Sequence, residues 1–234
     1  MALEKNRGRR ITPGELAVVV GAGRSGIAAA RLLRRAGAKV RLLDSNIKAL
    51  AGRESLATEL AAQGIDVQLG EHIAGQFAGA AFVVPSPGMP VAKLAGLVDT
   101  QVSEILAEME LAWRYLDDEP VLAITGTSGK TTTASLAAAM LHEQGYAVFL
   151  GGNIGTPLSE YVLGGKKADV LVLEISSFQL QCCTTFCPRA GILLNITPNH
   201  LDYHKDMAEY TEAKFRLFRC QSEEDLAVFG EELR

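Results

Sequence analysis

The stretch Pro120-Val-Leu-Ala-Ile-Thr-Gly-Thr-Ser-Gly-Lys-Thr-Thr-Thr133 joins a short apolar run, a glycine loop and the start of an alanine-rich segment. The apolar run at 121–124 predicts a buried strand, and the segment from Thr131 onward predicts a helix with Leu136 and Met140 at helical spacing. A strand, a glycine loop and a helix in this order present backbone N–H groups and the positive end of the helix to an anion. The stretch therefore predicts an α/β fold in which this loop binds phosphate.

The composition of the loop predicts a nucleoside triphosphate as its ligand. Lys130 adds a mobile positive charge, and the hydroxyl of Thr131 is a ligand that magnesium accepts. The usual pattern G-x-x-x-x-G-K-[ST] requires a glycine where this chain has Ile124, and the shorter G-x-x-G-K-T occupies 126–131. The alternative is an ordinary glycine-rich turn before a surface helix. The predicted contacts to the ATP phosphates are Gly126, Thr127, Ser128, Gly129, Lys130, Thr131 and Thr132.

The bulk composition is that of a globular protein with one large or two modest domains. The chain has 234 residues, of which 48% are hydrophobic and 21% are charged. Its net charge of −4 provides no basic surface, so nucleic acid is not expected as a partner. The N-terminus lacks the apolar core of a secretory signal, and no apolar run approaches the ~20 residues of a membrane span. Four cysteines without C-x-x-C spacing indicate reduced thiols, so we expect a cytoplasmic protein without membrane insertion.

A second glycine loop occurs in the first half of the chain. The run 15–20 leads into Gly-Ala-Gly-Arg-Ser-Gly at 21–26, a predicted helix follows, and Gly37 is its expected stop. The next predicted strand, 39–44, ends in Asp44. These features form the dinucleotide-binding fingerprint. The glycines allow a tight turn, the helix N-terminus binds phosphate, and the acid hydrogen-bonds to a ribose hydroxyl. The pattern predicts a Rossmann-like fold that binds a nucleotide-like diphosphate, or the same fold with an empty loop.

The chain between the two glycine loops suggests a domain boundary. The predicted strand 81–84 ends in Pro85-Ser-Pro-Gly88, at the same sheet edge as the first loop. We expect Ser103 to cap a helix that runs to about Leu116. An acidic cluster and Pro120 follow and break the pattern. The predicted domains are a Rossmann-like parallel-sheet domain over 1–112 and part of a P-loop ATPase-type α/β domain over 113–234.

Three ionisable residues follow predicted strands in the second half. Glu174 lies near the carboxyl end of an apolar strand at 169–175, His200 follows the next strand, and Lys214 lies on the helix after it. Because the carboxyl ends of parallel strands share one edge, we expect the phosphate loop, Glu174 and His200 to meet there. Such a group suits magnesium-assisted phosphoryl transfer. Each residue also has an ordinary structural interpretation. Glu174 fits a carboxylate at a solvated strand end, His200 a loop histidine with ordinary hydrogen bonds, and Lys214 a solvated helix lysine.

With these residues assembled, the sequence resembles the Mur ligase family over nearly its whole length. The segment E-x-S-S-F-Q-L is the most discriminating, and the short phosphate loop is a family trait that accounts for Ile124. Together they indicate the branch that adds D-glutamate to UDP-N-acetylmuramoyl-L-alanine in peptidoglycan biosynthesis. The matching segments are G-A-G-R-S-G at 21–26, P-S-P-G at 85–88, I-T-G-T-S-G-K-T-T at 124–132, G-G-N-I-G at 151–155, L-E-I-S-S-F-Q-L at 173–180, N-H-L-D at 199–202 and Y-T-E-A-K at 210–214.

The resemblance implies an ADP-forming ligase that makes an amide bond through an acyl phosphate. It implies ATP and Mg²⁺ as cofactors, UDP-N-acetylmuramoyl-L-alanine and D-glutamate as substrates, and a monomeric protein. The implied catalytic residues are Lys130, Glu174, His200 and Lys214, and the implied metal ligands are Thr131, Glu174, His200 and Lys214, the last as a carbamate. The implied contacts to the UDP substrate are Gly23, Arg24, Ser25, Asp44, Ser45, Ser86, Pro87, Gly88, Asn153 and Ser176.

One departure from the family pattern limits the expected activity. The family has three domains, and this chain stops just after the predicted strand at 225–229. We therefore expect a truncated polypeptide that binds the UDP substrate at best and ligates poorly or not at all. The alternatives are a nicotinamide-dependent dehydrogenase, a related ligase acting on another carboxylate such as a folate-polyglutamating enzyme, and a non-catalytic nucleotide-binding module.

Overall fold

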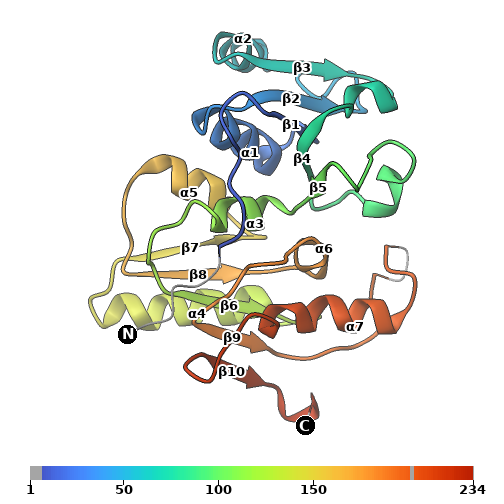
Figure 1. Cartoon of the computed structure of the whole chain (residues 1–234). Coiled ribbons are helices and arrows are strands. Elements are labelled where there is room, and N and C mark those ends of the chain that lie inside the picture. The colour runs from blue at the N-terminus through green and yellow to red at the C-terminus, as the bar shows by residue number, and fades with distance from the viewer. Residues whose placement is uncertain (1–6, 201–202, 234) are drawn as a thin grey trace.

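The computed structural model describes residues 7–200 and 203–233. In this part of the chain two parallel sheets, each of five strands, lie one above the other (Figure 1). The first sheet is built from the first half of the chain and the second sheet from the second half, which confirms the predicted fold class of two successive parallel α/β units. Among the described residues no helix is both long enough and apolar enough to cross a membrane.

The first sheet has the strand order β3-β2-β1-β4-β5, which is that of a Rossmann-like half. The central strand β1 is almost fully buried because it has neighbours on both sides and helices over the sheet, and its Val18 pairs with Arg41 and Val83. The strands are β1 Leu16–Val20, β2 Lys39–Asp44, β3 Ile65–Leu69, β4 Ala80–Pro85 and β5 Glu104–Ile105, and the helices are α1 Arg24–Arg35 and α2 Glu54–Ala62, with 3₁₀ turns η1 Ala74–Gln76 and η2 Val91–Leu94.

The second sheet has the strand order β10-β9-β6-β8-β7, with the strand before the phosphate loop at its centre. All its strand pairs are parallel, so the carboxyl ends of β6, β8 and β9 open at one edge. Its strands are β6 Val121–Thr125, β7 Val148–Gly152, β8 Val170–Glu174, β9 Ala190–Leu193 and β10 Leu226–Phe229; the helices are α4 Lys130–Glu143, α5 Leu158–Gly164, α6 Ser177–Gln181 and α7 Met207–Phe215, with 3₁₀ turns η3 Arg216–Phe218 and η4 Glu231–Leu233.

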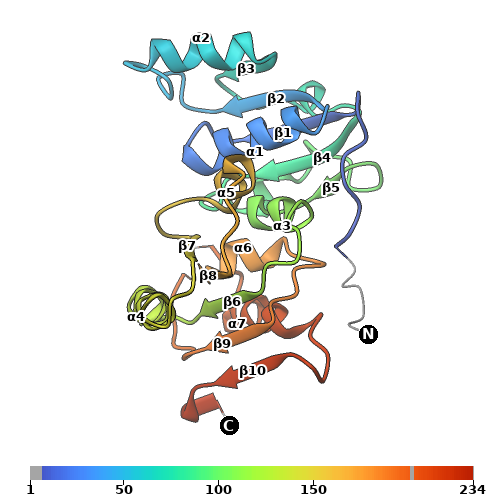
Figure 2. The same ribbon diagram turned by 90° about the vertical axis from the view of Figure 1, so that its left-hand side faces the viewer.

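Two helices, α3 (Glu108–Trp113) and α5, lie between the sheets (Figures 1 and 2). Helix α5 follows β7 of the second sheet, yet it packs on α1 and α3. The chain passes from the last strand of the first sheet to β6 between residues 105 and 121. This interval contains the predicted boundary at 112/113, which falls within α3 and remains a prediction.

The predicted helix over 103–116 is wrong in its start and its cap. The hydroxyl of Ser103 donates to the carbonyl of Ala80 at 2.7 Å and caps no helix. Residues 104–105 extend the first sheet as β5, and α3 begins only at Glu108. The prediction failed because a serine before an apolar stretch satisfies a helix N-terminus and a neighbouring strand equally well.

The apolar side of α4 also differs from the pattern in the sequence. Ala134 and Ala138 face the sheet, whereas Leu136 and Met140 are about 60% and 62% exposed. Small side chains allow the helix to lie close to β6 and β8, which brings its N-terminus to the sheet edge. The alanines therefore position the phosphate loop.

Candidate active site

The phosphate loop connects β6 to α4 as the sequence predicts. Gly129 precedes α4 with φ of 80°, a left-handed conformation that favours glycine, and no side chain caps the helix. The backbone N–H groups of Thr127 and Ser128 donate to Oδ1 of Asn195, which follows β9, at 3.1 and 3.0 Å. Asn195 thus fixes the loop from the neighbouring strand. Asn195 was not among the residues predicted from the sequence, although its place after a strand of this sheet was a signal.

Two lysines converge on one carbonyl of the loop. Nζ of Lys130 donates to the carbonyls of Gly126 at 3.1 Å and Thr127 at 3.0 Å, and Nζ of Lys214 donates to Gly126 at 2.9 Å. Lys214 is only 1% exposed, so it is not a solvated helix lysine. Burial and, to a smaller extent, the positive charge of Lys130 together lower the pKa of Lys214 to about 7. The Lys214 amine is therefore partly neutral near neutral pH, in the form that reacts with electrophiles such as CO₂.

Glu174 lies at the carboxyl end of β8 and is 2% exposed, which rules out a solvated strand end. Its Oε2 accepts a hydrogen bond from the hydroxyl of Thr131 at 2.6 Å, and its Oε1 accepts one from Nδ2 of Asn153 at 2.9 Å. A buried carboxylate beside a hydroxyl at the mouth of a phosphate loop supplies the oxygen ligands that Mg²⁺ prefers. Thr131 and Glu174 therefore fit the implied metal.

His200 comes near this edge but stays exposed. It has φ of 55°, and its ring packs against Phe178 and Tyr210 with centroids 4.8 and 6.4 Å apart. The hydroxyl of Tyr210 lies 3.0 Å from that of Thr127 in the phosphate loop. Tyr210 is a contact that the sequence analysis did not single out. Among the described residues no three His, Cys, Asp or Glu side chains form a group that could hold a metal, so the metal roles of His200 and Lys214 remain predictions.

The predicted UDP-substrate residues of the first sheet lie at its carboxyl edge. A Cβ on Gly26 would lie 1.9 Å from the carbonyl oxygen of Gly21, so only glycine lets α1 begin this close to β1. A Cβ on Gly21 would lie 2.7 Å from that of Ser86, which places the loops 21–26 and 86–88 side by side. Asp44 lies beside them, where its Oδ2 accepts the N–H of Ala22 at 2.7 Å.

The remaining predicted contacts are distributed over both halves. Gly23, Ser45 and Gly88 are exposed and Pro87 is half-buried, all on the loops of the first sheet, and Ser25 is half-buried in the first turn of α1. Ser176 begins α6, where its hydroxyl accepts the N–H of Gln179 at 3.3 Å. Asp202 of the N-H-L-D segment lies outside the described residues.

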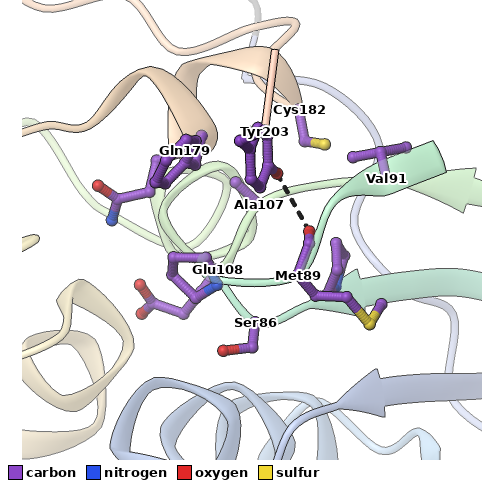
Figure 3. Close-up of a pocket in the computed structure, with 11 residues that line it drawn as sticks. Ser86, Met89, Val91, Ala107, Glu108, Gln179, Cys182 and Tyr203 are labelled. Atoms are coloured by element: carbon purple, nitrogen blue, oxygen red, sulfur yellow. Dashed lines mark hydrogen bonds between the residues drawn. The ribbon is translucent and has the colours of Figure 1, made fainter. Parts of the chain in front are cut away.

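A small pocket lies where the two halves meet (Figure 3). Ser86 and Met89 line it from the first sheet, and Gln179 and Tyr203 line it from the second half. The hydroxyl of Tyr203 donates to the carbonyl of Met89 at 3.1 Å, which is the dashed line in Figure 3. The loop after β4 and helix α6 therefore face one shared space.

Glu108, at the start of α3, also lines this pocket and is 3% exposed. Its Oε1 accepts the backbone N–H of Ser159 at 2.6 Å, across the boundary between the halves. Burial raises the pKa of Glu108 to about 7, against the hydrogen bonds from Ser159 that lower it. The sequence analysis did not single out Glu108, because nothing in its local pattern distinguishes it from a surface carboxylate.

The fold and the site together define a two-part α/β protein, with a Rossmann-like sheet joined to a sheet that carries a phosphate loop. The family pattern described as the Mur ligase middle domain matches residues 124–232. The pattern described as the Mur ligase MurD-like N-terminal domain matches residues 15–103. The chain belongs to the Mur ligase family, of which it contains these two domains.

The relatives agree with this assignment. The chain is 82% identical over its whole length to the UDP-N-acetylmuramoylalanine–D-glutamate ligase of Desulfovibrio desulfuricans, and 62% identical to that of Nitratidesulfovibrio vulgaris. It covers 54% of each, so it spans about half the length of the curated relatives it matches. The crystal structure of MurF ligase from Thermotoga maritima in complex with ADP is similar over 97% of this chain and 47% of that one, at 20% identity and a TM-score of 0.43.

Proposed function

We propose that this chain holds the UDP-precursor and triphosphate sites of an ATP-dependent ligase that joins D-glutamate to UDP-N-acetylmuramoyl-L-alanine. One observation carries the proposal. Lys130 and Lys214 both donate to the carbonyl of Gly126, and the hydroxyl of the neighbouring Thr131 donates to Glu174. This arrangement pairs mobile positive charge with a buried carboxylate at a phosphate loop, which suits phosphoryl transfer. The names of the relatives support the choice of D-glutamate and of the UDP precursor.

The proposed reaction has two steps. The alanyl carboxylate attacks the γ-phosphorus of ATP, which gives an acyl phosphate and ADP. The amine of D-glutamate then attacks the acyl carbon, loses a proton and expels phosphate. Because both steps move negative charge between bound groups, positioning and electrostatic stabilisation do most of the catalysis.

The residues of the phosphate loop have distinct proposed tasks. The N–H groups at the start of α4 bind the phosphates, and Nζ of Lys130 leaves its loop carbonyls to contact the transferred group. Thr131 and Glu174 would hold a magnesium ion, which neutralises charge on the phosphate oxygens when bound. Asn153 keeps the Glu174 carboxylate turned toward the loop.

The first sheet has the proposed task of binding the UDP part of the precursor. The N–H groups of the 21–26 loop and the adjacent loop at 86–88 face the diphosphate, Ser45 faces the ribose, and Asp44 holds the loop in place through the N–H of Ala22. Ser176 and Asn153 then lie on the path of the muramoyl-alanine end toward the second site. We place this function in the cytoplasm and in a monomer.

Calorimetric titration of UDP-N-acetylmuramoyl-L-alanine into this chain tests the proposal. We expect one binding site per chain. Binding of an ATP analogue without any binding of the precursor would contradict the proposal and favour a nucleotide-binding module. Tight binding of NADH, followed by fluorescence, would instead favour a dehydrogenase. Because the chain spans half of its relatives, we expect little D-glutamate-dependent phosphate release from it.

A further inference from the structure

Arg24 is the first residue of α1, yet its guanidinium is turned toward the second half of the chain. Its Nε and Nη2 donate to the two carboxylate oxygens of Glu160 at 2.9 and 2.8 Å, which is a fork-to-fork ion pair. Its Nη1 donates to the carbonyl of Gly155 at 2.7 Å, and Nη2 also donates to the hydroxyl of Thr156 at 3.2 Å. These bonds occupy four of the five N–H donors of a guanidinium. Arg24 is therefore engaged by the protein itself.

The loop that Arg24 contacts leads directly to the candidate metal ligand. Gly155 and Thr156 end the turn between β7 and α5, and the N–H of Gly152 closes this turn on the carbonyl of Thr156 at 3.0 Å. At the start of the turn, Asn153 donates its backbone N–H to the carbonyl of Glu174 at 2.8 Å and its side chain to Oε1 of Glu174 at 2.9 Å. One short hydrogen-bonded turn thus separates the guanidinium of Arg24 from the carboxylate of Glu174.

Helix α5 is also fixed to the first half at two other points. Glu108 accepts the N–H of Ser159 near its start, and Arg35 donates to the carbonyls of Val162 and Leu163 at its end, at 2.8 and 3.2 Å. Arg35 and Arg24 are both on α1 and both reach α5 or the turn before it. Only Arg24 contacts the turn that carries Asn153, so Arg35 provides a matched control in the same interface.

We propose that Arg24 is a positioning residue that ties the glycine loop of the first sheet to the Asn153–Glu174 pair of the second. This inference rests on the proposed function, in which a substrate held by the first loop must reach a phosphate held by the second. An alignment error of about 1 Å between such groups costs on the order of 10²-fold in rate. Arg24 was expected from the sequence to contact the UDP substrate, and in the unliganded chain its guanidinium contacts the second half instead.

Hydrogen exchange of the unliganded chain, read by mass spectrometry, tests this role without any ligand. We expect Arg24→Met to speed exchange of the amides at 152–156 about fivefold, because the turn loses the hydrogen bonds from Arg24 to Gly155 and Thr156. Arg24→Lys restores part of the protection, since an ammonium reaches one of these acceptors but lacks the fork. Arg35→Met leaves 152–156 unchanged and speeds exchange only at the end of α5.

A second arm uses UDP-N-acetylmuramoyl-L-alanine at saturating concentration. We expect its binding to slow exchange at 152–156 and at the end of β8 in the unchanged chain and in Arg35→Met, but not in Arg24→Met. Unchanged exchange in unliganded Arg24→Met, or equal effects of Arg24→Met and Arg35→Met, would overturn the inference. If the precursor binds no variant, the proposed function fails, while the unliganded comparison still decides the role of Arg24.

Discussion

The two glycine loops have the same local architecture but different charged surroundings. Each follows a central parallel strand and begins a helix. Near the 21–26 loop, the carboxylate of Asp44 accepts the N–H groups of Ala22 and Asn46 at 2.7 and 2.9 Å. This carboxylate therefore helps to hold the loop in its conformation. At 126–131 the nearby charges are Lys214 and Glu174, both almost fully buried.

This difference indicates a division of tasks between the halves. Burying a charge costs folding free energy unless the charge is paired and hydrogen-bonded. Buried charges therefore occur preferentially at functional sites, where they act on a bound group. In the proposed function the first loop binds an anion through its backbone N–H groups. The second loop lies beside a lysine with a lowered pKa and a buried carboxylate, and we propose that the chemistry takes place there. Four substitutions test this division, in order of decreasing expected effect.

The largest effect concerns the pH dependence of stability. A free lysine has a pKa of 10.5, and that of Lys214 is lowered to about 7 in the fold. Between these values the unfolded chain binds a proton that the folded chain does not, so the free energy of unfolding rises with pH, here by about 3 kcal/mol. Lys214→Met removes this rise from denaturant titrations at pH 7 and 10. The exposed-site control Lys39→Met keeps it, and equal slopes for both variants would contradict a buried Lys214.

The second effect concerns the triphosphate. Lys130→Met removes the mobile positive charge of the loop, and we expect an ATP analogue to bind about 50-fold more weakly in calorimetry. We expect the affinity for the UDP precursor to change little, because we propose that the first half binds the UDP part of that ligand. Equal losses for both ligands would show that the two sites are not separate.

The third effect concerns the metal. Glu174→Gln keeps groups that hydrogen-bond to Thr131 and Asn153 but removes the negative charge, so the gain in nucleotide affinity on adding Mg²⁺ falls about tenfold. The control Glu59→Gln removes an exposed carboxylate on α2 and keeps the full magnesium effect. A magnesium effect that survives in Glu174→Gln would place the metal elsewhere.

The smallest effect concerns the first loop. Asp44→Asn weakens one of the hydrogen bonds that hold the loop, so we expect the UDP precursor to bind about threefold more weakly, with unchanged affinity for the ATP analogue. The control Asp66→Asn, on the exposed part of β3, leaves both affinities unchanged. A large loss in Asp44→Asn would mean that Asp44 contacts the ligand directly.

Most strands and both glycine loops were predictable because their signals are local. Apolar runs end directly in glycines in both halves, and β2 coincides with the predicted strand at 39–44. The segment 54–69 was not predicted, although it forms α2 and β3. Ile65, Val67 and Leu69 alternate with polar residues, which is a local signal for a half-buried strand, and β3 pairs with β2.

The candidate site was predictable in its parts but not in its connections. The meeting of Glu174 with Thr131 of the phosphate loop followed from the parallel sheet. The burial of Glu108, the bonds of Asn195 to the phosphate loop and the direction of Arg24 depend on partners far away in sequence. No local pattern specifies such partners, so these residues required the fold.

The most direct test of two separate sites is simultaneous binding of both ligands. UDP-N-acetylmuramoyl-L-alanine is titrated calorimetrically into the chain alone and into the chain saturated with an ATP analogue and Mg²⁺. We predict one precursor site per chain in both titrations, with an affinity that is equal or higher when the nucleotide is present. Displacement of either ligand by the other would show that they share one site, and would contradict the account.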